Sequence, residues 1–470
     1  YLARIDALNT RGPELRAIID VNPDALEIAD RLDGERRSGT VRGPLHGIPV
    51  VLKDNIDTHD RMTTTAGSLA LEGSIPLEDS FIAAKLRDAG AILLAKANMS
   101  EWAYWRGYNA SSGWSARGGQ CRNPYALDRT PCGSSSGSGV AAAANLAALT
   151  IGTETGGSII CPSSINGIVG VKPTVGLWSR AGIIPISHSQ DSAGPMTRTV
   201  RDAAILLGAA CGVDPRDPAT SASNGRFHAD YTTFLDPKGM AGARIGIVRN
   251  VSGFDARVLA LFDRAIDAMK AQGAVVVDPA NLPHLDSGSV FQELPTVVLN
   301  YEFKANINRY FASLAPGARV KTLTDLITFN DANREKEMPY FGQERLLVSE
   351  RTTSLDAPEY RRAVETVQRM TRAEGIDAVM KQHRLDALLF VGGNGAGIAA
   401  KPGYPTVIVP FALVPPPAPA NRPYPAGFTP KPSPVGIAFT AMACSEGKLL
   451  SLGYAFEQAT KRRIAPPELK

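Results

Sequence analysis

The sequence has few cysteines and histidines and no long apolar run. Its five cysteines are an odd number without the spacing of a disulfide framework, so we expect them to be reduced. No HExxH motif and no paired Cys/His spacing indicates a metal site, and no GxGxxG or Walker-type loop opens a helix. No stretch is long and apolar enough to predict a membrane span. We therefore expect neither a metal nor a nucleotide cofactor, and no membrane partner.

The charge of the chain is close to balanced. Lys and Arg number 50 against 46 Asp and Glu, a net charge of +4 over 470 residues. Such a small and dispersed excess does not predict binding to nucleic acid. A hydrophobic content of 44% is typical of a large globular protein with ample core.

Two loops rich in glycine and serine are the most informative feature. They are GSSSGSG at residues 133–139 and GTETGGSI at residues 152–159. Gly156 and Gly157 lack Cβ atoms, so backbone N–H groups there can converge on a developing oxyanion. Ser158 follows directly, where the nucleophile of an acyl transfer would stand. The pair of loops predicts a catalytic site.

The run between the loops, VAAAANLAALTI, has one polar interruption, Asn145. Residues 140–152 are too short and too Ala-rich for a membrane span but suit a buried helix. A helix beginning near Ser136 would direct the positive end of its dipole toward Ser134. We therefore predict a buried helix between the two loops.

A candidate base lies upstream, in GIPVVLKDNID at residues 47–57. Residues 48–52 form an apolar, β-prone run that predicts a buried strand, and Lys53 stands at its carboxyl end. Burial lowers the pKa of a lysine from about 10.4, so a buried Lys53 could be neutral and accept a proton. The alternative is a Lys53 that ends the strand and faces water.

A different serine chemistry is also encoded. GSSSG fits the G-x-S-x-G elbow of α/β hydrolases, with Ser135 as nucleophile. That fold requires a histidine in a late loop after an acidic residue, and none of the downstream histidines meets this order. We therefore do not favour Ser135 as the nucleophile.

Several ordered motifs together carry a family resemblance. KDNID, CGSSSGSG, GTETGGSI and SSINGIVGVKPTVGL closely resemble the amidase signature family, and within it the peptide amidases. Further similar segments are LHGIPVVLKD, GIIPISHSQDSAGPMTRTV, GYPTVIVP and SLGYAFEQAT, so the resemblance covers nearly the whole chain. It is weakest between about residues 225 and 384.

The resemblance implies a Ser-Ser-Lys catalytic triad. Ser158 matches the nucleophile of the family, Ser134 the bridging serine and Lys53 the terminal base. The bridging serine of the family follows a cis peptide bond, which would here join Gly133 to Ser134. The family needs no cofactor, and its activity is the hydrolysis of linear amides through an acyl-enzyme.

The resemblance also implies the oxyanion loop and the fold. Thr155, Gly156 and Gly157 align with the oxyanion loop, to which Ser158 adds its own N–H. The implied fold class is α/β: a single domain over residues 1–470 with a mixed central sheet and helices on both faces.

The substrate is less well defined. Many relatives place an arginine two or three residues after the nucleophile, where this chain has Ile160 and Cys161. This favours neutral amides over acids such as malonamate. Peptide amidases commonly have an acidic residue where this chain has Gly156, so aryl acylamidase activity on anilides is an alternative to peptide carboxamides. A glutaminase-type subunit of a tRNA-dependent amidotransferase is a further alternative.

Local patterns predict elements along the rest of the chain. We expect helices at residues 80–88 and 257–270, and strands at residues 91–95, 244–248, 274–277, 387–391, 406–409 and 435–439. Residues 286–352 predict a helical insertion with several aromatics, some of which could line the substrate cleft, as could Trp102, Tyr104 and Trp105. Nine prolines at residues 415–434 predict a stiff surface loop. The first residue is Tyr1, inside an apolar helical pattern, so we expect a preceding segment and leave cytoplasmic and exported locations open.

Overall fold

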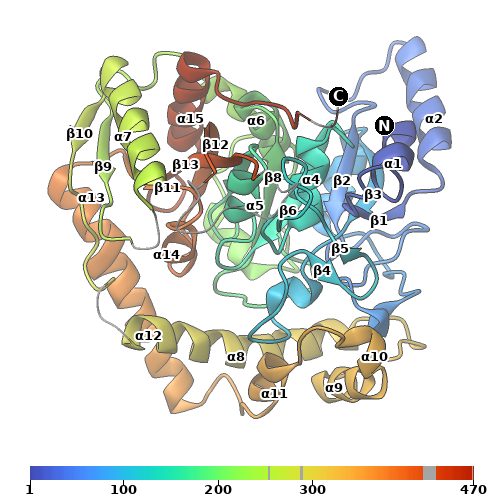
Figure 1. Ribbon diagram of the computed structural model, residues 1–470. Helices are drawn as coiled ribbons and strands as arrows, with labels where there is room; N and C mark the ends of the chain where they lie inside the picture. Colours follow the sequence, from blue (N-terminus) through green and yellow to red (C-terminus); the bar gives the residue numbers. More distant parts are fainter. Residues whose placement is uncertain (252–254, 286–288, 417–429, 468, 470) are drawn as a thin grey trace.

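The computed structural model describes residues 1–470 except 252–254, 286–288, 417–429, 468 and 470. Within that part, one mixed sheet of eleven strands runs through the molecule in the order β1-β3-β2-β6-β8-β7-β12-β13-β11-β9-β10, with a small separate hairpin β4-β5 (Figure 1). The strand bounds are β1 Ile18–Val21, β2 Pro49–Lys53, β3 Ile92–Ala97, β4 Trp114–Ser115, β5 Gly119–Gln120, β6 Leu149–Glu154, β7 Val169–Lys172, β8 Ser192–Thr197, β9 Arg244–Ile247, β10 Val275–Val277, β11 Ala387–Val391, β12 Thr406–Val414 and β13 Ser433–Thr440.

Helices connect and cover the strands. They are α1 Leu2–Leu8, α2 Ala25–Arg37, α3 Phe81–Asp88, α4 Ser136–Ala143, α5 Ile160–Ile165, α6 Val200–Ala209, α7 Ala256–Ala271, α8 Ser289–Ala312, α9 Leu323–Ala332, α10 Arg334–Glu337, α11 Glu344–Glu350, α12 Pro358–Thr371, α13 Asp377–His383, α14 Ala396–Ala400 and α15 Glu446–Thr460. Short 3-10 turns occur at Leu69–Leu71, Glu101–Tyr104, Pro218–Ser223 and Tyr231–Phe234, and a π turn at Arg372–Ile376.

The sheet is covered on both faces. Along β2, Val50 and Leu52 belong to the largest apolar core, whereas Val51 belongs to a second core that also contains Val140 of α4. Successive residues of a strand point to opposite faces, so the two cores lie on opposite sides of the sheet. A strand buried on both faces reads as a continuous apolar run, as β2 does. This is the α/β architecture expected from the sequence.

The catalytic candidates lie on neighbouring parallel strands. β2 pairs in parallel with both β3 and β6, so the carboxyl ends of β2 and β6 meet at one edge of the sheet. Ligands of α/β proteins bind at such edges. β6 then pairs antiparallel with β8, which begins the mixed part of the sheet.

The run at residues 140–152 is not one helix. It contains the second half of α4, which ends at Ala143, and the first four residues of β6. Asn145 has a φ of +57°, which breaks the helix, and the β-branched Thr150 and Ile151 then favour a strand. The expected start of the helix near Ser136 is correct. Gly137 lets α4 approach the sheet, because a Cβ there would lie 2.2 Å from the carbonyl oxygen of Ala17.

The other predicted elements are confirmed with shifts of a few residues at their ends. Residues 80–88 form α3, whose N-cap Ser80 accepts a hydrogen bond from the N–H of Ala83. Residues 257–270 fall within α7. The predicted strands correspond to β3, β9, β10, β11, β12 and β13.

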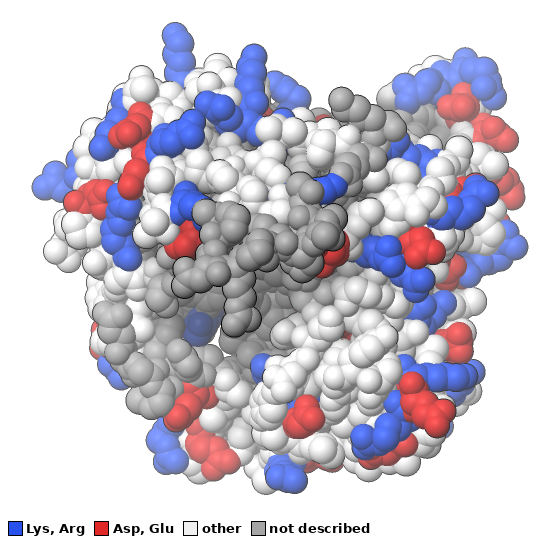
Figure 2. All heavy atoms as spheres, viewed as in Figure 1, with Lys and Arg blue, Asp and Glu red and all other residues white. Residues whose placement is uncertain are grey.

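The segment at residues 286–352 contains α8, α9, α10 and α11 in its described part, and these helices lie along the lower side of the molecule in Figure 1. In the Pro-rich segment, residues 417–429 lie outside the described residues, and β13 begins at Ser433. Figure 2 shows basic and acidic side chains interspersed over the visible face. Among the described residues, no helix has both the length and the apolar character needed to cross a membrane.

Candidate active site

Lys53 ends β2 inside the protein and has no exposed surface. Its Nζ donates to Ser134 Oγ at 2.7 Å, to Thr153 Oγ1 at 2.8 Å and to the carbonyl oxygen of Thr153 at 3.2 Å. Burial lowers the pKa of Lys53 to about 7, against the opposing charges of Asp191 and Glu154. The lysine therefore lies behind the two serine loops and can be neutral near pH 7, as a base requires.

Ser134 lies between Lys53 and the second loop. The peptide bond that joins it to Gly133 is cis, as the family resemblance predicts. The carbonyl oxygen of Ser134 accepts a hydrogen bond from the N–H of Ser100 at 3.0 Å. The next residue, Ser135, donates its N–H to the carbonyl oxygen of Ser158 at 3.1 Å. The backbones of the two serine loops are thus joined directly beside Ser134.

Ser158 is half-buried and lies at the surface of a cavity, in front of the buried Ser134. Gly157, just before it, has a φ of +124°, which favours glycine. The N–H groups of Ile159 and Ile160 donate to Glu154 Oε2 at 2.7 and 2.9 Å. These bonds fix the chain immediately after Ser158.

The oxyanion candidates lie on the same loop. Within the described part of the chain, the N–H groups of Gly156 and Ser158 make no hydrogen bond, so both are available as donors. Thr155 is held from the side, because its hydroxyl donates to Asp191 Oδ1 at 2.5 Å. Asp191 also accepts the N–H groups of Ile186 and Ser187. The loop is therefore anchored on both sides of its two glycines.

The structure brings the three triad candidates together, with one hydrogen bond not formed. Lys53 and Ser134 are bonded through their side chains, but among the described residues neither hydroxyl of Ser134 and Ser158 donates to the other. Catalytic hydrogen bonds of a free enzyme are often long and tighten when substrate binds.

The cavity in front of Ser158 has a volume of about 510 Å³, which is the size of a small-molecule site. Thr155, Gly156 and Ser158 line one side of it. The rest of the lining comes from distant segments of the chain, namely Ala103, Tyr104, Trp105, Ile186, Gln190, Asn250, Val251, Leu285, Pro295, Thr296, Leu299, Arg345, Gly397, Ile398 and Lys401. Tyr104 and Trp105 are thus cavity residues as expected, whereas Trp102 is core.

The helical segment at residues 286–352 contributes few aromatics to this cavity. Tyr301, Phe303 and Phe311 are buried in apolar cores, and Tyr310 donates to Asp57 Oδ1 at 2.9 Å. The side chain of Phe291 lies outside the described residues. The wall that this segment provides consists instead of Pro295, Thr296, Leu299 and Arg345.

Ser135 is not placed to be a nucleophile. Its side chain has no exposed surface, and its Oγ donates to the carbonyl oxygen of Thr153 at 2.9 Å while accepting the N–H of that residue at 3.1 Å. No histidine contacts it within the described part of the chain. The G-x-S-x-G match is therefore a coincidence of composition.

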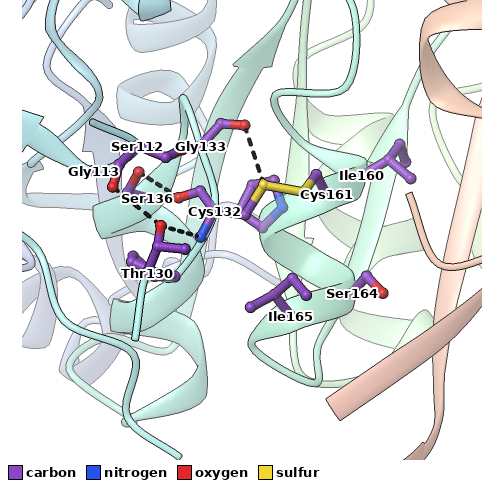
Figure 3. Close-up of a disulfide and its surroundings, with 12 residues drawn as sticks. Ser112, Gly113, Thr130, Cys132, Gly133, Ser136, Ile160, Cys161, Ser164 and Ile165 are labelled. Carbon is purple, nitrogen blue, oxygen red and sulfur yellow. Dashed lines mark hydrogen bonds between the residues drawn. A yellow bond between two sulfur atoms is a disulfide. The ribbon is translucent and has the colours of Figure 1, made fainter. Parts of the chain in front are cut away.

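The expectation that all cysteines are reduced is wrong. Cys132 and Cys161 form a disulfide between the residue two before Ser134 and the residue three after Ser158 (Figure 3). Figure 3 also shows two hydrogen bonds at Cys132: its N–H donates to the hydroxyl of Thr130, and its carbonyl oxygen accepts from the hydroxyl of Ser136. The remaining cysteines, Cys121, Cys211 and Cys444, are free. The disulfide gives the two serine loops a covalent link.

Three side chains near the site were not found from the sequence. Thr153 supplies two of the three acceptors of Lys53, Glu154 holds the turn after Ser158, and Asp191 holds Thr155. Thr153 and Glu154 belong to the GTETGGSI motif, which the sequence analysis had already singled out. Their hydrogen-bond partners, however, depend on the fold. Among the described residues, no group of three or more His, Cys, Asp or Glu side chains is placed to bind a metal ion.

Comparisons with known proteins agree on one family. A family model described as Amidase matches residues 1–450. The peptide amidase from Stenotrophomonas maltophilia is 48% identical and has a TM-score of 0.91, with 99% of this chain and 93% of that chain covered. An amidase family protein from Bacillus anthracis is 36% identical with a TM-score of 0.89, covering 99% and 87%. One subunit of the glutamyl-tRNA(Gln) amidotransferase of Rippkaea orientalis is 33% identical over 100% of this chain and 95% of its own.

Proposed function

This chain belongs to the amidase family and is an amide-hydrolysing enzyme, and on that premise we propose that it cleaves the C–N bond of neutral linear amides through a Ser158 acyl-enzyme. In this proposal Ser134 is the bridging serine and Lys53 the terminal base. The single observation that carries it is the 2.7 Å contact between the buried Lys53 amine and Ser134 Oγ.

The hydrogen-bond partners of Lys53 fit a neutral amine. A neutral amine has two N–H donors and one lone pair. As an ammonium, Lys53 donates all three of its bonds. In the neutral form its two donors match the hydroxyl and the carbonyl oxygen of Thr153, and the 2.7 Å contact reverses, so that the lone pair accepts the hydroxyl proton of Ser134. The pKa of about 7 favours this form at neutral pH.

The relay proceeds in two proton transfers. Lys53 accepts the proton of Ser134, and Ser134 accepts the proton of Ser158 as the Ser158 oxygen attacks the amide carbon. The resulting oxyanion is stabilised by backbone N–H groups of the loop at Thr155, Gly156, Gly157 and Ser158. Ser134 then returns a proton to the leaving nitrogen, the C–N bond breaks, and water repeats the sequence to release the acid.

For the substrate, we propose peptide carboxamides. Support comes from the 48% identity to a peptide amidase and from the cavity of about 510 Å³, which accommodates a short peptide end. The residues that follow Ser158 do not offer a cation beside the scissile bond, because Ile160 is buried and Cys161 is in the disulfide. This supports an amide without a carboxylate next to the scissile carbonyl.

Aryl acylamidase activity is the second candidate. A Cβ built on Gly156 meets no atom within 4 Å, so the oxyanion loop has free space that an aromatic amine could fill. A glutaminase-type subunit remains a third candidate, because this chain is also 33% identical to one such protein. A purified chain that hydrolyses amides without partner chains would exclude that third candidate.

The test is a panel of dipeptide amides and acetanilides with release of ammonia or amine measured. We expect ammonia release by the wild-type chain, and none by Ser158→Ala. Equal turnover by both proteins would disprove the mechanism. Faster release of aniline than of ammonia would favour the aryl acylamidase.

A further inference from the structure

The cavity in front of Ser158 has an uneven charge. Of its described lining residues only Arg345 and Lys401 are charged, and both are cations. Thr155, Gly156 and Ser158 line the same cavity without adding a charge. Lys401 has interactions beyond its bond to the carbonyl oxygen of Gly397, so the charge left to attract an anionic group of a ligand is that of Arg345.

Among the residues that the structure describes, Arg345 has no anionic partner. Its side chain makes no ion pair and no hydrogen bond with the described residues, and its Nε is buried without a partner. Two arginines that line the neighbouring cavity differ, because Arg180 is paired with Asp217 and Arg216 with Asp214. A half-buried guanidinium without a partner is costly, and a ligand would supply the missing contact.

The guanidinium is nonetheless held in place. Its central carbon lies 4.6 Å from the ring of Trp105 and 5.2 Å from that of Tyr108. Trp105 is in turn fixed, because its indole nitrogen donates to Ser349 Oγ at 3.2 Å. The backbone N–H of Arg345 donates to the carbonyl oxygen of Arg106 at 3.0 Å. An arginine fixed in this way loses little freedom when a ligand binds.

We propose that Arg345 binds a carboxylate of the amide substrate, on a part remote from the scissile bond, and so selects acidic peptide carboxamides. This inference rests on the proposed function. A carboxylate fits because the planar fork of one guanidinium binds it through two parallel hydrogen bonds. The scissile amide stays neutral, and the acid lies across the cavity from Ser158.

The test compares two acetylated dipeptide amides, Ac-Glu-Leu-NH2 and Ac-Met-Leu-NH2, whose variable side chains have similar lengths. We measure kcat/KM for ammonia release by the wild type, Arg345→Gln and Arg345→Lys. The wild type should prefer the Glu peptide, and Arg345→Gln should lower the Glu:Met ratio by about tenfold or more. Arg345→Lys should give an intermediate ratio, because lysine keeps the positive charge but cannot form the two parallel hydrogen bonds of a guanidinium.

The matched control is Arg351→Gln. Arg351 follows α11, is exposed and does not line the cavity, so its loss should leave the Glu:Met ratio unchanged. The wild-type preference should also weaken as salt is raised. An unchanged ratio in Arg345→Gln, or the same fall in Arg351→Gln, would overturn the proposal.

Failure of the proposed function gives a different result. If the wild type releases ammonia from neither peptide, hydrolysis of peptide carboxamides is wrong, whatever Arg345 does. Calorimetric binding of both peptides to Ser158→Ala then decides the inference without turnover. Tighter binding of the Glu peptide, lost when Arg345→Gln is added, supports it, and equal or undetectable binding of the two overturns it.

Discussion

The amine of Lys53 and the hydroxyl of Ser134 are 2.7 Å apart, and both residues are almost completely buried. The contact links residues 81 positions apart and gives the proposed base a route to the second serine loop. Because burial lowers the pKa of the amine to about 7, we expect an activity that relies on this pair to depend on pH.

The first prediction is the pH profile. Lys53 has a pKa of about 7, lowered by burial. Below this pH the amine is protonated and cannot accept the proton of Ser134. Above it the amine is neutral. We expect kcat/KM to rise with pH through an inflection at about 7 and then level off, measured by initial rates of ammonia release.

A second buried group requires a control. Burial also raises the pKa of Asp57 to about 7, and Tyr310 is hydrogen-bonded to it. Asp57→Asn removes this titration and keeps the size of the side chain. The inflection should persist in that variant. A rise that begins only near the ordinary lysine pKa of about 10 would contradict a neutral Lys53.

The second prediction concerns Thr153, whose hydroxyl accepts from Lys53 at 2.8 Å. Thr153→Val keeps the shape of the side chain and removes the acceptor. Loss of this acceptor destabilises the ammonium form of Lys53 more than the neutral amine. The pKa of Lys53 should therefore fall, and the inflection should move to lower pH. The lysine is also less well positioned, so we expect kcat to fall about tenfold with little change in KM. A fall in activity at an unshifted inflection would mean that Thr153 has a purely structural role.

The third prediction concerns the disulfide, which closes a loop with a sequence separation of 29. A loop of this length stabilises a protein by about 3.5 kcal/mol. For a chain of this size, the Cys132→Ser/Cys161→Ser double variant should unfold about 3 to 4 °C below the wild type. Scanning calorimetry at a fixed rate measures this difference. Cys444→Ser, at a free cysteine, is the control and should not lower the midpoint.

Reduction provides an independent check on the same bond. Dithiothreitol should lower the unfolding midpoint of the wild type to that of the double variant. It should have no further effect on the double variant itself. A wild type that is insensitive to reductant and shows five titratable thiols would rule out the disulfide.

The fourth prediction concerns Gly156, where an added Cβ meets no atom within 4 Å. Gly156→Leu should leave the unfolding midpoint unchanged, because the side chain extends into the cavity. It should lower kcat/KM for an acetanilide at least about tenfold more than for a dipeptide amide, because the leaving amine of an anilide is bulkier. Equal losses on both substrates would show that this space is not used by the leaving group.

The sequence predicted the parts of the site that short motifs determine. The apolar run before Lys53 indicated a buried strand, whereas the sequence left a solvent-facing Lys53 open as the alternative to a buried one. Gly156, Gly157 and Ser158 form one local turn, so their placement needed no knowledge of distant contacts. The α/β fold followed from alternating helix and strand patterns together with the family resemblance.

The rest could not be predicted, for physical reasons. The alanines at residues 141–144 suit a short helix as well as the first part of a longer one, and the sequence alone does not show that Asn145 adopts the positive φ that separates α4 from β6. Two cysteines 29 positions apart carry no pairing signal until the fold brings them together. Arg345 is one of many arginines, and only the fold places it at the cavity with a buried Nε that has no partner among the described residues.

The cavity wall and the reactive centre come from different stretches of the chain. Lys53, Ser134 and Ser158 all precede residue 160, whereas much of the cavity lining comes from Leu285, Pro295, Thr296, Leu299, Arg345, Gly397, Ile398 and Lys401. We therefore expect reactivity and selectivity to be separable traits in this enzyme. Transplanting the later wall from a relative would exchange the range of accepted amides, while the reaction of Ser158 with a small acylating reagent would keep its original rate.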